Sequence, residues 1–166
     1  MDLVDLMEDL EEFDTLYASP GMEFIEPLAD YETEQEKLWS YIHNRYPFYG
    51  YGMWTVEDKK TGKVIGRAGL GEREIDGVEY TEIGYMLHHL YRRNGIGFEI
   101  CQGILEYAKN TLYIEEIHAY TNKENTESRK LLQKLGFCEE GQVMWQEKQL
   151  EQYRCKLYQK KYNIFF

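Results

Sequence analysis

The stretch Arg92-Arg93-Asn94-Gly95-Ile96-Gly97 decides the fold, because it joins a glycine-rich turn to the start of a helix. A strand-like run, Glu82–Leu87, precedes it, and apolar residues at helical spacing follow from Ile96 to Ala108. Glycines let the backbone approach a ligand closely, and the first N–H groups of a helix point at an anion beside the positive end of the helix dipole. The stretch therefore predicts a site for a phosphate or a pyrophosphate.

Two common phosphate-binding loops do not fit this stretch. The Walker loop ends in Gly-Lys-Ser or Gly-Lys-Thr, and neither a lysine nor a hydroxyl residue follows Gly97. The dinucleotide fingerprint of the Rossmann fold needs a third glycine three residues after the second, and that position is Ile100. A Rossmann oxidoreductase is therefore disfavoured.

The spacing Arg-x-x-Gly-x-Gly in Arg92–Gly97 resembles the acyl-coenzyme A loop of the GNAT superfamily of N-acetyltransferases. Downstream, Asn125–Phe137 is similar to that family's N-x-x-S/A-x-x-L-x-x-K-L-G-F element. Upstream, Ile65–Leu70 and Glu82–Tyr85 resemble two strands of the subgroup that acetylates the N-termini of ribosomal proteins. These four matches occur in the family's order over roughly residues 53 to 141, which makes them far more specific together than any one alone.

The resemblance implies that the protein moves an acetyl group from acetyl-coenzyme A (acetyl-CoA) to a primary amine, of a small molecule or a protein N-terminus, by direct attack. The pantetheine arm would lie between two splayed parallel strands, Glu82–Leu87 and Glu116–Tyr120. The backbone N–H groups of Met86, Leu87 and His88 would polarise the acetyl carbonyl. The pyrophosphate would bind the loop, mostly through main-chain N–H groups, at Arg92, Arg93, Asn94, Gly95, Ile96 and Gly97.

The resemblance also implies the catalytic side chains. Glu82 would act as the general base through a water molecule, although the same carboxylate can instead form an ion pair with Arg67 or Arg73 across the hairpin. Ser128 would lie near the cofactor sulfur and deliver a proton to it. Asn125 would contact the pantetheine, cap the following helix, or do both.

One residue of the family's pattern is missing. Many members carry a tyrosine four residues after the serine, and that position is Leu132. Tyr85, Tyr113 and Tyr120 are the candidates to replace it as proton donor. The missing tyrosine also gives weight to an alternative, a coenzyme A-binding module with little or no catalysis.

Composition restricts the classes of protein that the chain can represent. Its 166 residues predict a single domain, residues 1–166, with enough hydrophobic content, 43%, to bury a core. The net charge of −11 disfavours a nucleic-acid partner, because neutralising phosphates requires a basic surface. It also suits steering of a cationic amine, although solubility is the favoured explanation of the charge. There is no apolar run of about twenty residues, so no membrane span is expected.

Cysteine usage and the start of the chain predict a cytoplasmic protein. Cys101, Cys138 and Cys155 are odd in number and widely spaced, which is typical of reduced thiols. The acidic residues at positions 1–5 argue against a secretory signal. His88-His89 does not predict a metal site, because adjacent residues on a strand point to opposite faces.

Hydrophobic periodicity predicts an α/β fold, with a mixed, mostly antiparallel sheet flanked by helices. The expected elements are helices at 3–17, 33–45, 95–110 and after Asn125 up to Gly136, and strands at 53–57, 64–74, 78–87, 116–120, 137–145 and 149–158, with a hairpin turn at Asp76-Gly77 and a helix stop at Pro47.

The start of the chain departs from the family, whose members usually open with a strand before the first helix. Without that strand one sheet edge would lack its usual neighbour. We therefore expect the edge to pair with a second copy of the chain, in a homodimer, or with the C-terminal segment Tyr162–Phe166.

Overall fold

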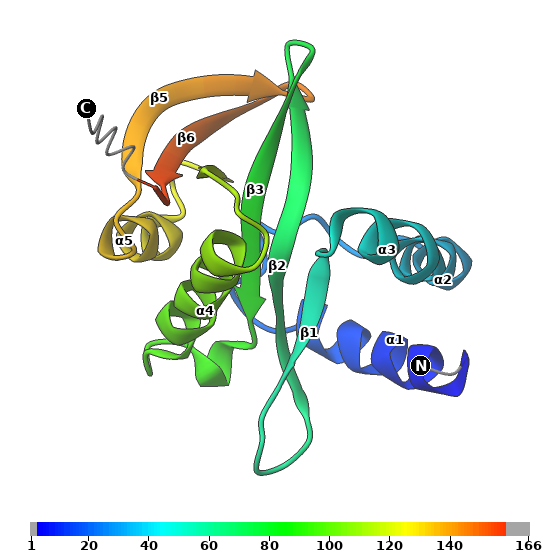
Figure 1. The fold of residues 1–166 in the computed structure, drawn as a ribbon. Coiled ribbons are helices and arrows are strands. Elements are labelled where there is room, and N and C mark those ends of the chain that lie inside the picture. The colour runs from blue at the N-terminus through cyan, green and yellow to red at the C-terminus, as the bar shows by residue number, and fades with distance from the viewer. Residues whose placement is uncertain (1–2, 159–166) are drawn as a thin grey trace, which may run out of the picture. The chain divides into compact units, whose positions relative to one another are not determined.

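The computed structural model of the chain describes the backbone of residues 3–158 and the side chains from Leu10 onward. In chain order the elements are α1 (Leu3–Tyr17), α2 (Tyr31–Ser40), the π-helix η1 (Tyr41–Arg45), α3 (Tyr46–Tyr49), β1 (Met53–Glu57), β2 (Val64–Ile75), β3 (Val78–Leu87), the 3₁₀ turn η2 (His89–Tyr91), α4 (Ile96–Asn110), β4 (Glu116–Thr121), α5 (Thr126–Lys134), β5 (Cys138–Trp145) and β6 (Lys148–Lys156) (Figure 1). The predicted order of helices and strands is confirmed.

The strands form a six-stranded sheet with the order β1-β2-β3-β4-β6-β5. β3 and β4 pair in parallel, whereas β1–β2, β4–β6 and β5–β6 pair antiparallel, so the predicted mixed and mostly antiparallel sheet is confirmed. The hairpin between β2 and β3 turns at Asp76 and Gly77, whose φ angles are +52° and +77°. Two successive positive φ angles are the mark of a type I′ turn, as the Asp-Gly pair predicts.

The chain forms two compact units, and the division runs through β2, β3 and α4. The first unit contains residues 1–71 and 83–101, and a core in it gathers Leu16, Met22 and Met86. The second unit contains residues 72–82 and 102–166, and its fully buried side chains include Ile117, Leu132 and Tyr153. The expectation of a single domain over residues 1–166 stays a prediction.

The second predicted helix differs from the structure. It begins earlier, at Tyr31, where Asp30 caps it by accepting a hydrogen bond from the N–H of Thr33 at 3.0 Å. It does not stop at Pro47, because the chain continues through η1 into α3, where proline occupies the first turn and its missing N–H is not needed. The helical run ends only at Gly50, with φ +73°.

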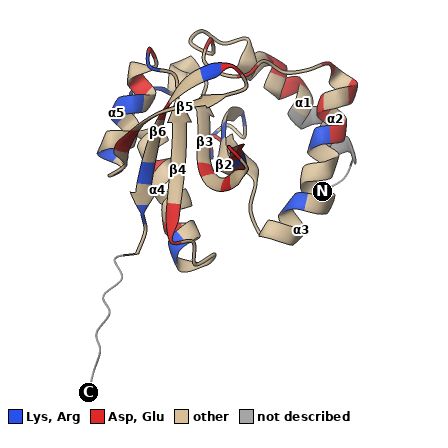
Figure 2. Ribbon diagram, turned by 90° about the horizontal axis from the view of Figure 1, so that it is seen from above, with Lys and Arg blue, Asp and Glu red and all other residues tan. Residues whose placement is uncertain are grey.

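The segment from α2 to α3 is only partly buried. Its apolar positions Leu38, Tyr41 and Ile42 are half-buried, and no residue of α2, η1 or α3 is fully buried. Acidic residues recur along α2, at Glu32, Glu34 and Glu36 (Figure 2).

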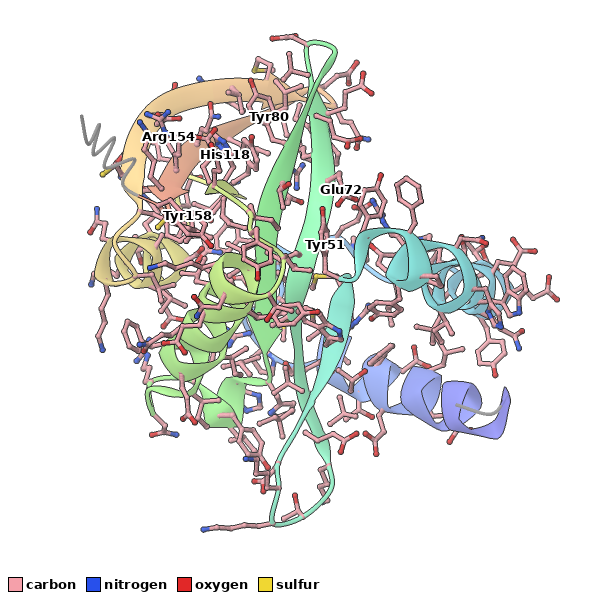
Figure 3. All side chains as sticks on the ribbon, in the orientation of Figure 1. Tyr51, Glu72, Tyr80, His118, Arg154 and Tyr158 are labelled. Carbon is pink, nitrogen blue, oxygen red and sulfur yellow. The ribbon has the colours of Figure 1, made fainter. Side chains whose placement is uncertain are left out.

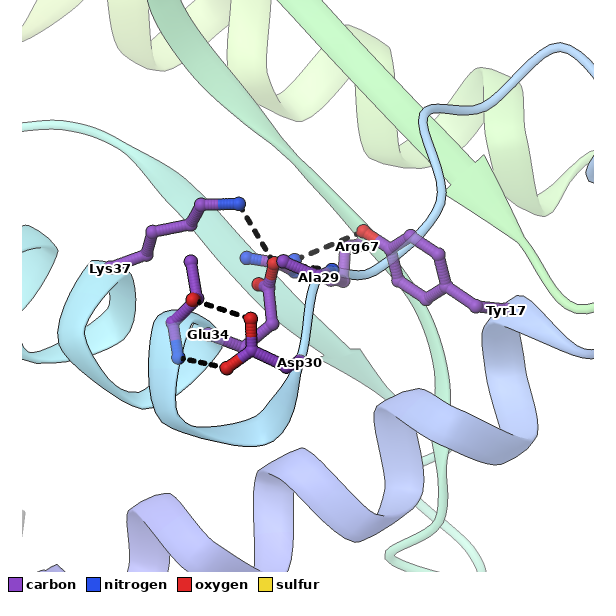
Figure 4. Close-up of polar contacts among 7 residues, drawn as sticks. Tyr17, Ala29, Asp30, Glu34, Lys37 and Arg67 are labelled. Carbon is purple, nitrogen blue, oxygen red and sulfur yellow. Dashed lines mark hydrogen bonds and ion pairs between the residues drawn. The ribbon is translucent and has the colours of Figure 1, made fainter.

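Arg67 links β2 to the N-terminal helix within the first unit. Its Nη1 donates to the hydroxyl of Tyr17 at 3.1 Å (Figure 4). Its guanidinium also lies 4.4 Å from the ring centroid of Phe13. Nearby, Glu34 accepts hydrogen bonds from the backbone N–H of Ala29 and from Lys37 (Figure 4). These contacts hold the start of α2 and the end of α1 in place.

The first element of the described chain is α1, and β1 lies at one edge of the sheet, paired with β2. Residues Tyr162–Phe166, which we expect to cover an edge, lie outside the described residues. Pairing of an edge with a second copy stays a prediction. In the part of the chain that the structure describes, no helix has the length and apolar character needed to cross a bilayer.

Candidate functional site

The loop before α4 has the backbone geometry of an anion site. Arg93 and Gly95 both adopt left-handed conformations, with φ +62° and +81°, and α4 begins at the next residue, Ile96. The carbonyl of Gly95 accepts the N–H of Glu99, so the amides that precede Glu99 in the first turn have no acceptor inside the helix. Beyond its two neighbours, no described residue has an atom within 4 Å of the place where a Cβ of Gly95 would lie. The loop therefore has both the donors and the space to hold a phosphate group.

The side chain of Arg92 makes contacts within the protein that hold the loop in place. Its Nε donates to the carbonyl of Leu87 at 2.8 Å, and its Nη2 approaches the sulfur of Met22 at 3.4 Å. The guanidinium is thus fixed against the N-terminal segment, whereas Arg93 and Asn94 are exposed. Contact of Arg92 and Arg93 with a phosphate stays a prediction.

The end of β3 offers fewer amides than the sequence predicts. The N–H of His88 donates to the carbonyl of Ile65 at 2.7 Å, so the prediction that it polarises an acetyl group is wrong for this conformation. Backbone groups alternate in direction along a strand, so the N–H of Met86 points the same way as that of His88. Of the three predicted donors to the acetyl carbonyl, Leu87 remains, because its N–H points toward the other edge of β3.

The prediction that the two adjacent histidines point to opposite faces is wrong. Their ring centroids lie 4.5 Å apart, because β3 ends at Leu87 and His89 already belongs to the 3₁₀ turn. Nδ1 of His88 accepts the N–H of Leu90. Burial lowers the pKa of His88, and the neighbouring His89 and Arg92 lower it further.

In the second unit, Glu82 lies where β3 and β4 meet. It is opposite His118, the one register pair between these two strands among the described residues. Both carboxylate oxygens of Glu82 are bound by Arg73, Nε to Oε2 at 2.5 Å and Nη2 to Oε1 at 2.9 Å. The ion pair that the sequence allowed across the hairpin is therefore present with Arg73, and Arg67 binds Tyr17 instead.

Aromatic rings surround this ion pair. The Cζ of Arg73 lies 4.1 Å from the ring centroid of Trp145 and 5.1 Å from that of Tyr120. Only 17% of the Arg73 side chain is exposed, and its Nη1 is buried with no hydrogen-bond partner among the described residues. We define Arg73, Glu82, Tyr120 and Trp145 as the Arg73 cluster. Sequence reasoning missed Trp145, because no local pattern connects it with a strand so far away in the chain.

His118 and Tyr80 extend the Arg73 cluster. The rings of Tyr80 and His118 meet edge to face with centroids 4.8 Å apart (Figure 3), and His118 stacks toward Tyr120 at 6.4 Å. Nε2 of His118 lies 3.2 Å from Oε1 of Glu116. Burial raises the pKa of Tyr120 well above its usual range, and the charge of Glu82 acts in the same direction. Tyr120 therefore keeps its proton at neutral pH.

Asn125 caps α5 as predicted. Its Oδ1 accepts the N–H of Ser128 at 3.1 Å, which also fixes the start of the helix that carries Ser128. At the other end, Gly136 follows the C-cap Leu135 with φ +88° and donates to the carbonyl of Gln133, as a C′ glycine does. The Ser128 side chain is half-buried.

The model of a protein family described as an acetyltransferase (GNAT) domain matches residues 3–138. The chain belongs to this family. A GNAT fold is also what the solved structures indicate: the ribosomal-protein-S5-alanine acetyltransferase from Vibrio fischeri has a TM-score of 0.75 at 18% identity, covering 94% of this chain and 90% of that one. The putative acetyltransferase yncA from Salmonella typhimurium, solved with its cofactor acetyl-CoA, has a TM-score of 0.69 at 20% identity, covering 96% of this chain and 92% of that one.

Among curated relatives, the GNAT chain is 31% identical to the protein YkkB of Bacillus subtilis (strain 168) over 88 residues, 53% of this chain and 51% of that protein. The chain thus spans about half the length of the curated relatives that it matches. Within the GNAT frame the predicted site residues fall into two groups. The residues from Met86 to Gly97 lie in the first unit, and Glu82, Asn125 and Ser128 lie in the second.

Proposed function

We propose that this GNAT protein is an acyltransferase that moves the acetyl group of acetyl-coenzyme A to a primary amine by direct attack. The observation that carries the proposal is the left-handed loop from Arg92 to Gly97, which presents backbone amides at the start of α4 in a chain of the GNAT family. The Salmonella typhimurium protein yncA was solved with acetyl-CoA as its cofactor, which supports the same cosubstrate here.

The residues that would hold the cofactor are mostly main-chain donors. The pyrophosphate would bind amides of Arg93 to Gly97, with the Arg93 side chain as the added charge and Arg92 bracing the loop. The N–H of Leu87 would bind the acetyl carbonyl, and Asn125 would contact the pantetheine while it caps α5. When bound, acetyl-coenzyme A supplies the acetyl group as an activated thioester.

Glu82 is the residue that we propose as general base. Its two oxygens accept from Arg73, which fixes the orientation of the carboxylate, and each oxygen keeps a lone pair for a water that relays the proton of the amine. Ser128 is the proposed donor to the leaving sulfur. Among the tyrosines that could replace the family's missing one, Tyr120 fits best, because its hydroxyl is buried and retains its proton, whereas Tyr113 is 75% exposed.

The alternative is a coenzyme A-binding module with little catalysis. One observation favours it: both oxygens of Glu82 are already engaged by Arg73, which weakens the carboxylate as a base. The two functions share the cofactor loop and differ in turnover alone.

The acceptor is a small molecule or a protein N-terminus. The Vibrio fischeri neighbour is an S5-alanine acetyltransferase, which supports an N-terminal amine and hence membership of the ribosomal-protein subgroup. The net charge of −11 suits a cationic acceptor. We propose a cytoplasmic location from the free thiols, and a homodimer that pairs through the sheet edge at β1.

Two measurements on the full chain test the proposal. Titration calorimetry should detect binding of acetyl-CoA, and a screen of amines with a free-thiol readout should find acceptor-dependent release of coenzyme A. Binding without release for any amine would favour the binding module. Absence of acetyl-CoA binding would overturn both functions.

A further inference from the structure

The Arg73 cluster contains a donor that has no partner among the described residues. Arg73 uses Nε and Nη2 for Glu82, and this two-point contact fixes the plane of the guanidinium. Its third nitrogen, Nη1, is buried and donates to no described residue. A charged, buried N–H without an acceptor is costly, so such a group is retained when a ligand completes it.

The surroundings of Arg73 hold the guanidinium rigid. Trp145 lies against it at 4.1 Å and Tyr120 at 5.1 Å, so it is stacked as well as paired. A stacked and paired arginine is preorganised to bind an oxygen with defined direction, which a lysine is not. Because Nη1 is buried in this structure, the groups that cover it have to move to admit the ligand.

We propose that Arg73 selects the acceptor by donating Nη1–H to an oxygen adjacent to the acceptor amine, so that the protein prefers α-amino acids or peptide N-termini to simple amines and polyamines. The inference rests on the proposed acetyl transfer, with Glu82 as base. Glu82 and Nη1 lie on different sides of one guanidinium, and an amine and a carbonyl on neighbouring carbons are suited to reach both.

Charge supports the same choice. Glu82 is the carboxylate that would attract a second ammonium group of a polyamine, and Arg73 already neutralises it with two hydrogen bonds. A polyamine would place a further positive charge beside a fixed guanidinium, which is unfavourable. A carboxylate or a peptide carbonyl brings the oxygen that Nη1 lacks.

The test compares matched acceptors on the full chain. A panel of α-amino acid amides, the corresponding free amino acids and the same amines without the carbonyl group, with spermidine added, is assayed for kcat and KM with acetyl-CoA. We expect at least about 100-fold higher kcat/KM for the best carbonyl-bearing acceptor than for its matched amine, because a site built around a polar group rejects an analogue that lacks it. The amide and free-acid arms tell a peptide carbonyl from a carboxylate.

Three variants test whether Arg73 sets the preference. Arg73→Lys keeps the charge and removes the fork. Arg73→Met with Glu82→Gln removes both charges in case Arg73→Lys does not fold; because it also removes the proposed base, it is compared with Glu82→Gln alone by calorimetric binding of the panel to the coenzyme A-loaded protein. Arg154→Met is the matched control, since it removes an arginine of the same unit that pairs with Glu140 at 2.5 Å and, more weakly, with Glu116 at 3.8 Å, and not with Glu82. Arg73→Lys should reduce the preference to less than about tenfold, mainly through a higher KM for the carbonyl-bearing acceptor. Arg154→Met should keep the preference.

The outcomes separate this inference from the proposed function. Equal use of amides and plain amines by the parent, or an unchanged preference in Arg73→Lys, overturns the role of Arg73 while acetyl transfer stands. Failure of the parent to bind acetyl-CoA overturns the proposed function. If the parent binds acetyl-CoA without turnover, calorimetry of the same panel on the coenzyme A-loaded protein decides, and binding of amides no tighter than of plain amines overturns the role of Arg73.

Discussion

The loop from Arg92 to Gly97 is built from backbone groups, whereas the Arg73 cluster is built from side chains. The loop presents backbone amides from successive residues, and the side chain of Arg92 is turned back to brace it. The Arg73 cluster presents side chains only, one from each of four strands, β2, β3, β4 and β5. The loop should therefore lose its ligand when a substitution changes the backbone conformation. The cluster should lose its activity when a substitution changes a functional group. The following experiments test that distinction.

Gly95→Val should produce the largest effect, a complete loss of acetyl-CoA binding. Valine at φ +81° strains the loop and fills the space beside it. At a hundredfold excess over the dissociation constant, the parent should gain about 2.7 kcal/mol of stability from the ligand, and the variant none, as read by thermal melting.

Gly62→Val is the matched control for that experiment. Gly62 also has positive φ, +70°, and open space around it, but it lies in the turn between β1 and β2. Its replacement should cost a comparable amount of stability and leave the acetyl-CoA shift intact. A retained shift in Gly95→Val would remove the loop from the cofactor site.

Glu82→Gln should come next, with turnover lowered by roughly 10²-fold and acetyl-CoA affinity nearly unchanged. The change preserves shape and removes the proton acceptor. Glu140→Gln, which breaks the ion pair with Arg154, serves as control and should leave turnover unchanged. Equal turnover in Glu82→Gln and the parent would assign Glu82 a structural role as the partner of Arg73.

Asn125→Ala should cost about 1 kcal/mol of unfolding free energy, because the N–H of Ser128 loses its cap. Asn125→Asp keeps a capping oxygen and should restore most of that stability. Urea denaturation measures both variants, and acetyl-CoA titration of the stable Asp variant isolates any contact with the pantetheine. If both variants are as stable as the parent, the cap contributes nothing measurable.

The smallest effect concerns His88. Its pKa is lowered in the folded protein from the ordinary value of 6.5, so the unfolded chain binds the proton more readily. Stability that His88 contributes is therefore present above about pH 6.5 and lost as the pH falls below it. Thermal melting of His88→Gln should show a weaker decline between pH 7 and 5 than the parent. His43→Gln, an exposed histidine on η1, should leave the decline unchanged.

Features encoded in consecutive residues could be predicted from the sequence. Asp76-Gly77 gave the type I′ hairpin, Asn125 gave the cap of α5, and the glycine loop gave the start of α4. In each case the conformation depends on side chains within a few positions, so a local pattern contains the physical cause.

Features that depend on tertiary partners could not be predicted. From the sequence, Arg67 and Arg73 were equal candidates for the ion pair with Glu82. In the structure Arg73 forms that pair, whereas Arg67 contacts Tyr17 and Phe13 of α1, which is far away in the sequence. The N–H of His88 was assigned to the cofactor because nothing local indicates its bond to Ile65. Pro47 was interpreted as a helix stop because a π-turn has no reliable sequence signature.

The π-helix at Tyr41–Arg45 has a geometric consequence for the N-terminal segment. A π-turn holds about one residue more than an α-turn. The segment therefore accommodates one extra residue without interrupting the helix. Deleting one residue there would let the helix close normally and would rotate Tyr31–Ser40 by about 100° about its axis. Glu34, which now interacts electrostatically with Arg67, would turn to another side. The extra residue therefore fixes the rotation of α2 about its own axis, and with it the side of α2 that is turned toward β2.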